Sequence, residues 1–415
     1  MPGYKQSEVG VIPEDWELTP FVALGSVIDG DRGANYPGSR DFSSDGHCLF
    51  LNAANVTKAG FRFRECAFIS REKDERLSKG KLKRDDIVLT TRGTVGNFAH
   101  YDATVSFENI RINSGMVILR NDSAALDTSF LYVFAQSNLM ERQIERLTFG
   151  SAQPQLTVKG INELSIVVPS ITEQRAIAQA LRDVDALLAT LDQVIDKKRD
   201  LKQATTQQLL TGETRLPGFI DEWQLKRLGD VVDTDPENLG ADTATDFWFN
   251  YISLEDVDRG QLRSHSEQVF IDAPSRARRK LMPNDVLVST VRPNLQSHLL
   301  FKGDAGHWVC STGFCVIRCR EGVTCPAFVF SHFFAADVNR QIDTLLTGSN
   351  YPAINSGDVR NLEIMFPSYV EQCAIATVLS EMDAELSALE ARRDKTHNIK
   401  QAMMQELLTG KTRLV

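Results

Sequence analysis

The sequence predicts an α+β protein built as an internal repeat, with two mixed α/β domains separated by two long helices that pack against each other. Three observations predict this fold: the second half of the chain repeats the first, two long stretches carry apolar residues at helical spacing, and the remaining blocks mix strand and helix patterns. The chain has 415 residues, of which 42% are apolar and 24% charged. That length and composition are typical of a globular protein with more than one core.

The repeat is clearest at an offset of 198 residues, where 171–216 align with 369–414 without a gap. Glu173-Gln174 matches Glu371-Gln372, and the closing Leu-Leu-Thr-Gly at 209–212 recurs at 407–410. Self-similarity of this kind indicates two copies of one structural unit. The predicted boundaries are 1–169 for the first mixed domain, 170–216 for the first long helix and linker, 217–367 for the second mixed domain, and 368–415 for the second long helix.

Each similar block has the pattern of one long helix. Ser170-Ile171-Thr172-Glu173 and the matching Ser368 to Glu371 form capping boxes, and Gly212 and Gly410 suit the left-handed residue beyond a helix end. Apolar residues between these signals alternate at spacings of three and four, which is the pattern of a coiled-coil seam. The predicted seam comprises Ile177, Leu181, Val184, Leu188, Leu191, Ile195, Ile375, Leu379, Met382, Leu386 and Leu389.

A helix of about 40 residues is a rod of roughly 60 Å, too long to be buried within one small domain. An amphipathic rod must bury its apolar stripe, and the nearest matching stripe is the other rod. We therefore expect the two rods to pack together. The alternative is that each is an ordinary surface helix of its own domain.

The divergent blocks combine strands and helices. Apolar runs at 86–92, 114–119, 285–290 and 314–317 predict buried strands, and the spacing at 130–146 and 328–342 predicts helices. Residues 58–84 carry ten Lys and Arg against four acids, and 276–280 carry four positive charges in five residues, although the net charge of the chain is −9. A basic run is either a solvated face or a phosphate-binding surface.

In each half a basic stretch leads into a strand that ends at Thr and Arg. An arginine at the end of a rigid strand can bind a guanine edge, a phosphate or an internal carboxylate. The candidate nucleic-acid contacts are Arg76, Lys79, Lys81, Lys83, Arg84, Thr91, Arg92, Arg276, Arg278, Arg279, Lys280, Thr290 and Arg292.

Catalytic motifs are missing from the sequence. Gly410-Lys411-Thr412 resembles the end of a phosphate loop, but Gln405 stands where that loop needs glycine. There is no Gly-x-Gly-x-x-Gly, no His-Glu-x-x-His and no Asn-Pro-Pro-aromatic loop of an amino methyltransferase. The seven cysteines lack a Cys-x-x-Cys knuckle, so we expect reduced, mostly buried thiols and no metal site. The start lacks the apolar core of a signal peptide, and we expect a cytoplasmic chain without a membrane span.

The start of the chain and the two helical blocks resemble a known family. Residues 4–17, beginning Tyr4-Lys5-Gln6-Ser7, together with the repeated Pro-Ser-x-x-Glu-Gln openings and Leu-Leu-Thr-Gly-x-Thr-Arg-Leu closings, are similar to the specificity subunits of type I restriction-modification systems. The resemblance implies a non-catalytic subunit with two target recognition domains held apart by an antiparallel coiled coil. Each domain would read one half of a bipartite double-stranded DNA site.

The resemblance also implies partners and cofactors. Two methyltransferase subunits that use S-adenosylmethionine would bind this chain, and restriction subunits that use ATP and Mg²⁺ would join the complex where the system has them. This chain would bind no cofactor itself. Two similar halves give a pseudo-twofold axis that suits duplex DNA, and the circular order of the repeat places the N- and C-terminal segments side by side. The alternatives are a scaffold that assembles protein partners without reading DNA, and an enzyme with an unfamiliar site.

Overall fold

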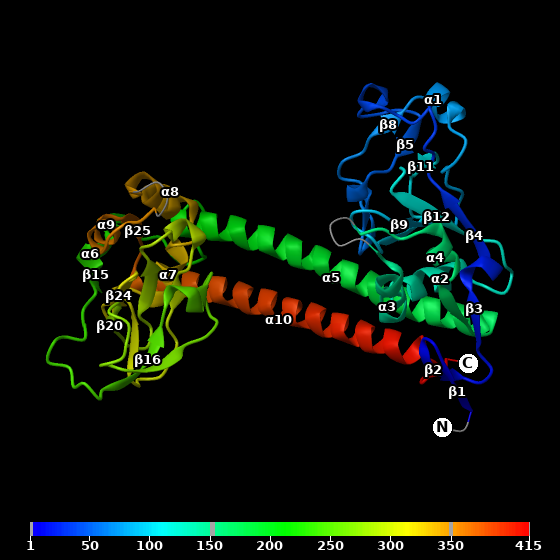
Figure 1. The fold of residues 1–415 in the computed structure, drawn as a ribbon. Helices are drawn as coiled ribbons and strands as arrows, with labels where there is room; N and C mark the ends of the chain where they lie inside the picture. The colour runs from blue at the N-terminus through cyan, green and yellow to red at the C-terminus, as the bar shows by residue number, and fades with distance from the viewer. Residues whose placement is uncertain (1–2, 150–153, 348–351, 415) are drawn as a thin grey trace. The chain divides into compact units, whose positions relative to one another are not determined.

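The computed structural model describes residues 3–149, 154–347 and 352–414 (Figure 1). The chain forms two compact units: unit 1 comprises Met1–Leu191 and Arg392–Val415, and unit 2 comprises Asp192–Ala391. The boundary between the units falls inside both long helices, α5 (Ile171–Thr211) and α10 (Tyr369–Leu407). Each unit therefore contains one mixed block and a segment of each helix.

Unit 1 is organised around a four-stranded sheet of order β10-β9-β12-β4, with a smaller sheet of order β11-β5-β8. The strands of these sheets are β4 (Gly25–Asp29), β5 (Cys48–Phe50), β8 (Phe68–Ile69), β9 (Ile87–Thr90), β10 (Phe98–His100), β11 (Ile110–Arg111) and β12 (Met116–Asn121). The two-stranded ribbons are β1 (Tyr4–Ser7) with β2 (Gly10–Pro13), β3 (Glu17–Pro20) with β13 (Ser165–Val168), and β6 (Val56–Thr57) with β7 (Gly60–Phe61). The helices besides α5 and α10 are α1 (Arg71–Arg76), α2 (Thr128–Ala135), α3 (Asn138–Leu147) and α4 (Val158–Asn162).

Unit 2 repeats this plan, with a four-stranded sheet of order β15-β24-β21-β22 and a second sheet of order β19-β16-β23-β20. Its strands are β14 (Gln224–Arg227), β15 (Val232–Thr234), β16 (Trp248–Ile252), β17 (Val257–Asp258), β18 (Gln261–Leu262), β19 (Ser266–Val269), β20 (Ala277–Leu281), β21 (Val286–Ser289), β22 (Leu299–Leu300), β23 (Trp308–Ser311), β24 (Phe314–Cys319) and β25 (Glu363–Phe366). Its short helices are α6 (Leu228–Val231), α7 (Pro326–His332), α8 (Ala336–Leu345) and α9 (Ser356–Asn361). The internal repeat is therefore a structural repeat, and the four predicted strands are confirmed as β9, β12, β21 and β24.

The predicted helix over 130–146 is two helices, α2 and α3, and the same break separates α7 from α8. Apolar spacing continues through the break, but Ser137 leaves the helical conformation and its hydroxyl accepts a hydrogen bond from the Met140 N–H at 3.3 Å. Serine competes for backbone hydrogen bonds in this way and so favours a new helix start.

In each unit the sheet core is completed by the beginning of one long helix and the end of the other. In unit 1, Ile177 and Leu181 of α5 lie in one core with Leu407 and Leu408, and Figure 1 shows α2 and α3 against α5. In unit 2, Ile375 and Leu379 of α10 share a core with Leu209 and Leu210. The two helix segments in each unit therefore run antiparallel.

Ion pairs between the helix segments have one register in both units. Lys400 pairs with Asp185 at 2.6 Å in unit 1, and Lys202 pairs with Asp383 in unit 2. These pairs are equivalent at the offset of 198 residues seen in the sequence. Of the predicted seam, Ile177, Leu181, Leu191, Ile195, Ile375 and Leu379 are buried, whereas Val184, Leu188, Met382, Leu386 and Leu389 are half-buried.

Candidate nucleic-acid interface

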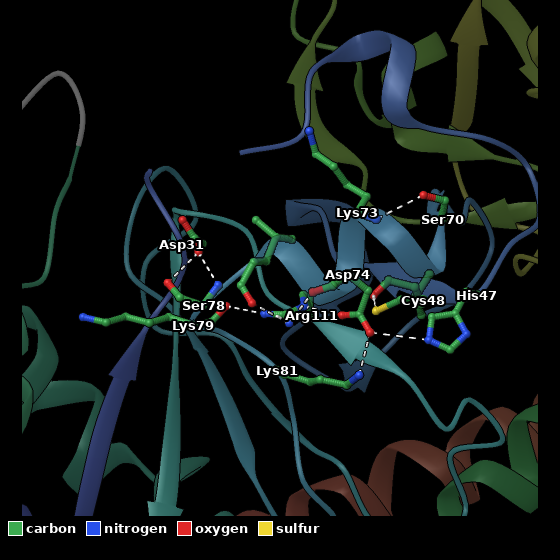
Figure 2. A network of polar contacts seen from close by, with 12 residues as sticks. Asp31, His47, Cys48, Ser70, Lys73, Asp74, Ser78, Lys79, Lys81 and Arg111 are labelled. Atoms are coloured by element: carbon green, nitrogen blue, oxygen red, sulfur yellow. Dashed lines mark hydrogen bonds and ion pairs between the residues drawn. The ribbon is translucent and has the colours of Figure 1, made fainter. Parts of the chain in front are cut away.

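The basic stretch of unit 1 is organised by one buried carboxylate, Asp74 of α1, whose side chain is 2% exposed. Figure 2 shows Arg111, Lys81 and His47 converging on it. Arg111 Nε donates to Asp74 Oδ1 at 2.5 Å and Lys81 Nζ donates to Oδ2 at 2.6 Å. Burial opposes ionisation of the carboxyl, but the hydrogen bonds from Lys81 and Arg111 outweigh it and lower the pKa of Asp74.

Arg111 and Asp31 then fix the path of the chain after α1. The Arg111 guanidinium donates to the carbonyl oxygens of Asp74, Leu77 and Lys79 at 2.7, 3.0 and 2.7 Å. Asp31 Oδ2 accepts from the Ser78 N–H at 2.8 Å, and its Oδ1 accepts from the Gly33 N–H at 2.8 Å. The backbone hydrogen bond from Gly33, followed by those from Ser78, lowers the pKa of Asp31 to about 2. These contacts hold residues 74–79 as an ordered surface segment.

This arrangement divides the basic residues predicted as contacts. Lys81 is neutralised by Asp74, and Arg84 donates to the carbonyl oxygens of Asp102 and Val105 at 2.7 and 2.8 Å while lying 4.1 Å above the Tyr101 ring. Both side chains therefore serve the fold, and we remove them from the contact set. Lys79, Lys83 and Arg76 are exposed, and Lys79 extends away from the network in Figure 2. Arg76 pairs with Glu72 at 2.6 Å, but both of these side chains lie on the surface.

The strand ends carry matching turns. Thr91 and Thr290 follow β9 and β21, are buried, and donate their hydroxyls to the carbonyl oxygens of Gly115 and Gly313 at 3.0 and 2.8 Å. Because these hydroxyls are already bonded inside the protein, the two threonines leave the contact set as well. They anchor the turns that present Arg92 and Arg292, both of which are exposed.

The two arginines do not occupy equivalent positions. Arg92 bridges to Gln155, whereas the matching bridge in unit 2 joins Val291 to Ala353. Arg292 is the residue after the bridging Val291, just as Gly93 is the residue after the bridging Arg92. Both have left-handed backbone conformations, with φ of 49° at Arg292 and 74° at Gly93. Bridge pairing therefore matches Arg92 with Val291, and the two arginines are displaced from each other by one residue.

The basic run of unit 2 begins one residue before β20, continues along that strand, and is also divided. Arg279 pairs with Asp235, whose other oxygen accepts from the Ser356 hydroxyl at 2.6 Å, so Arg279 is an internal residue and leaves the contact set. Arg278 lies 4.9 Å above the Phe270 ring. Arg276 is exposed and Lys280 is half-buried.

Each unit contains a cluster of one Trp, one Glu and one Arg, here called the Trp–Glu–Arg node, which the sequence analysis did not predict. In unit 1, Glu173 is fully buried; it accepts from Trp16 Nε1 at 3.1 Å, and Arg413 Nε and Nη2 donate to its two oxygens at 2.5 and 2.8 Å. Unit 2 repeats the node with Trp223, Glu371 and Arg215. The repeated Trp, Glu and Arg in the sequence were the available signal.

The node changes the role assigned to the capping-box glutamates. Ser170 Oγ accepts from the Glu173 N–H at 3.3 Å, as predicted, but the carboxylate binds Trp16 and Arg413. The prediction that the N- and C-terminal segments are neighbours is confirmed, because the Tyr4 hydroxyl donates to the Gly410 carbonyl oxygen at 3.0 Å. The predicted left-handed glycines are also confirmed, with φ of 74° at Gly212 and 68° at Gly410.

Comparison with known proteins decides the family. The family model described as the type I restriction modification DNA specificity domain matches residues 13–198 and 220–397. The chain belongs to this DNA specificity family. Each match covers one mixed block and the beginning of the following long helix, so this specificity protein carries two copies of the family domain.

Some similar proteins align with nearly the whole specificity chain. It is 23% identical to the putative type I restriction enzyme MjaX specificity subunit of Methanocaldococcus jannaschii, over 99% of this chain and 97% of the relative. It is 20% identical to the EcoKI specificity subunit of Escherichia coli, over 97% and 90%. The crystal structure of an S subunit from M. genitalium has the same fold, with a TM-score of 0.58 at 14% identity over 94% of this chain and 96% of that one.

Two further observations concern ligands and membranes. Over 3–149, 154–347 and 352–414, no group of three His, Cys, Asp or Glu side chains is arranged to hold a metal ion, and all seven cysteines are free thiols. Every helix of the specificity protein in these ranges is too short or too polar to cross a bilayer.

Proposed function

We propose that this specificity protein reads a bipartite site in double-stranded DNA, one part with each unit. One observation supports the proposal most directly. An exposed arginine follows β9 in unit 1 and β21 in unit 2, and these two strands hold equivalent places in two sheets of the same strand order. A rigid strand end limits the positions that a guanidinium can sample, and a bidentate arginine distinguishes guanine from other bases.

The contact set is smaller than the sequence suggested. In unit 1 it comprises Arg76, Lys79, Lys83 and Arg92, all exposed. In unit 2 it comprises Arg276, Arg278, Lys280 and Arg292, which are exposed or half-buried. We assign Arg92 and Arg292 to bases and the remaining residues to phosphates, which fix the register of the protein on the duplex without reading sequence.

The long helices act as the spacer between the two reading units. We assign them to an antiparallel coiled coil, supported by the ion pairs between α5 and α10 within each unit and by burial of seam residues such as Ile177 and Ile375. The helices also dock two methyltransferase subunits, and the pseudo-twofold repeat offers each of them the same surface.

The chain itself is a non-catalytic subunit. Methyl transfer from S-adenosylmethionine belongs to the docked methyltransferase subunits, and ATP- and Mg²⁺-dependent restriction belongs to further subunits of the complex. This assignment is supported by the absence of nucleotide, methyltransferase and metalloprotease motifs from the sequence. Methyl transfer or DNA cleavage by the isolated chain would contradict it.

Selection from a random duplex library tests the proposal. The chain assembled with its methyltransferase partner is expected to enrich one bipartite sequence. Arg92→Ala should relax one half-site by about 1–3 kcal/mol, a loss of roughly fivefold to 150-fold in discrimination, and Arg292→Ala should relax the other half-site only. Lys159→Ala, a change of an 87% exposed lysine on α4 outside the contact set, is the control.

Phosphate contacts give a different signature. Replacing Lys79 and Lys83 with alanine should weaken binding to all sequences and reduce the slope of log affinity against log salt by about 0.9 per lost contact. A change in sequence preference with an unchanged salt slope would contradict the phosphate assignment.

Two larger changes test the separate roles of the recognition blocks and the long helices. Replacing residues 217–367 with the block of a relative should change one half of the methylated site. Removing a matched heptad from α5 and α10 should shorten the spacer between half-sites. A change in both half-sites would refute modular reading, and an unchanged spacer would refute the helices as rulers. The alternative function, a scaffold that assembles partners without reading DNA, predicts a complex that enriches no sequence.

A further inference from the structure

Two cysteines of unit 2 meet where α7 approaches the first turns of α10. Cys325 immediately precedes α7 and Cys373 lies near the start of α10, and both line one shallow hollow of about 420 Å³. Burial and the nearby Cys373 thiol together raise the pKa of the Cys325 thiol, so the two side chains lie close to each other. No local pattern pairs these two cysteines, because 47 residues lie between them in the sequence.

The junction is held together by the neighbouring glutamine. Gln372 is 2% exposed, its Oε1 accepts from the Cys325 N–H at 2.9 Å, and its Nε2 donates to the Val323 and Pro367 carbonyl oxygens at 3.2 and 3.1 Å. These hydrogen bonds fix the loop before α7 against the helix that carries Cys373. The two sulfur atoms are therefore neighbours by construction of the junction.

Unit 1 provides an independent check on this geometry. At the offset of 198 residues, Cys325 corresponds to Asp127 and Cys373 corresponds to Arg175. Arg175 Nε lies 3.5 Å from Asp127 Oδ2, and the Asp127 N–H donates to Gln174 Oε1 at 2.7 Å. Side chains at these two positions thus interact in both units, as an ion pair in unit 1 and as two thiols in unit 2.

The two thiols differ in access. Cys325 is buried at 8% exposure, and that burial raises the pKa of its thiol, whereas Cys373 is half-buried and faces the hollow. The Cys373 thiol also raises the pKa of the nearby Tyr369 hydroxyl. An oxidant from solvent therefore reaches Cys373 first. Cys325 is then close enough to react with the oxidised Cys373 sulfur.

We propose that Cys325 and Cys373 form a redox-active dithiol that a hydroperoxide converts to a disulfide. In the first step the Cys373 sulfur attacks the outer peroxide oxygen, the O–O bond breaks, and an alcohol or water leaves, giving a sulfenic acid. In the second step the Cys325 sulfur attacks the Cys373 sulfur, the S–O bond breaks, and hydroxide leaves as water with the Cys325 proton. The two thiols lose two electrons, which reduce one peroxide, and a small thiol reverses the reaction by exchange.

The disulfide would join the loop before α7 covalently to α10. No equivalent bond can form in unit 1, because the Asp127 and Arg175 side chains contain no thiol. This disulfide would therefore constrain the second unit alone, whichever function the units have.

Peroxide treatment of the purified full-length chain tests the proposal. We expect non-reducing peptide mapping to show a crosslink between the peptides containing Cys325 and Cys373, reversed by dithiothreitol and lost in Cys325→Ser and in Cys373→Ser. The matched control is the double variant Cys325→Asp with Cys373→Arg, which carries the ion pair of unit 1. It should fold with an unchanged far-ultraviolet spectrum and form no crosslink.

A second probe does not depend on oxidation. Phenylarsine oxide bridges two thiols only when their sulfur atoms are close, so binding of one equivalent should be lost in either serine variant. Overoxidation of Cys373 with Cys325 left free, a crosslink between Cys325 and Cys319 in place of Cys373, or arsenical binding unchanged in the serine variants would each overturn the proposal.

Discussion

Replacing Glu173 with glutamine tests the Trp–Glu–Arg node that joins the start of α5 to the C-terminal segment in unit 1. The carboxylate accepts hydrogen bonds on both oxygens, from Trp16 Nε1 on Oε2 and from Arg413 on Oε1 and Oε2. Glutamine has nearly the same shape but presents an NH₂ group in place of one oxygen. That group faces a donor from Arg413 or Trp16, so at least one hydrogen bond is lost in a fully buried place.

The expected loss of stability follows from the surroundings. Breaking a buried ion pair by removing one partner costs about 3–5 kcal/mol. Arg413 is 35% exposed and keeps Asp15 at 2.9 Å, and glutamine keeps one acceptor, so we expect a loss at or just below the lower end of this range, about 2–3 kcal/mol. In a unit of this size, 1 kcal/mol shifts the unfolding midpoint by about 2–4 °C, so a loss of about 2–3 kcal/mol gives a decrease of about 4–12 °C.

Calorimetry combined with hydrogen exchange is the measurement. Glu173→Gln should lower the unfolding transition of unit 1, and Glu371→Gln should lower that of unit 2, because each node lies within its own unit. A double-mutant cycle with Glu173→Met and Arg413→Met should show a coupling of 1 kcal/mol or more. If Glu173→Gln leaves the midpoint within about 1 °C, or if the two methionine changes are additive, the node does not stabilise unit 1 as argued.

Three further predictions concern other polar groups. Burial lowers the pKa of His332 to about 3, and both of its ring nitrogens lack hydrogen-bond partners among the described residues. The unfolded chain therefore takes up a proton below pH of about 6.5 while the native chain does not, so stability is lost as the pH falls from about 6.5 towards 3. His332→Phe, which introduces the residue that unit 1 has as Phe134, should raise the midpoint and flatten that pH profile; an unchanged profile would contradict the burial argument. The pKa of Asp31 is lowered to about 2, so the stabilisation that this carboxylate provides is present above about pH 4 and disappears as the pH falls to 2. Asp31→Asn should therefore destabilise unit 1 by about 1–3 kcal/mol at neutral pH, as measured by urea titration. The same change should remove this acid sensitivity. Lys198 and Glu385 form an exposed pair at 2.7 Å, and exchanging the two residues should change stability by less than about 1 kcal/mol, whereas a larger loss would show that the geometry of this pair matters.

The two long helices were predictable because their signals are local. Capping serines, the apolar spacing and the left-handed glycines lie within the segments they define, so the predicted positions agree with α5 and α10 to within a few residues. The break between α2 and α3 was missed because apolar spacing continues through it. There the serine hydroxyl and the packing of two short helices outweigh the periodic pattern.

The internal partners of the candidate contacts could not be predicted, because charge density along the sequence does not reveal which charges pair in the fold. Lys81 and Arg279 belong to basic runs, yet each is paired with an aspartate, one of them 44 residues away in the sequence. Thr91 precedes the exposed Arg92 but is buried and bonded to Gly115. Only a structure separates the basic residues that face solvent from those that hold the fold.

By itself the sequence determined the internal repeat, the two long helices and the strands β9 and β21 at whose ends arginines stand, because repetition, spacing and capping are properties of neighbouring residues. The tertiary structure decided which distant side chains meet: Trp16 with Glu173 and Arg413, and Cys325 with Cys373. Such contacts form between segments that the fold brings together after many intervening residues. Their geometry depends on how sheets, loops and helix ends pack, and no local pattern records it.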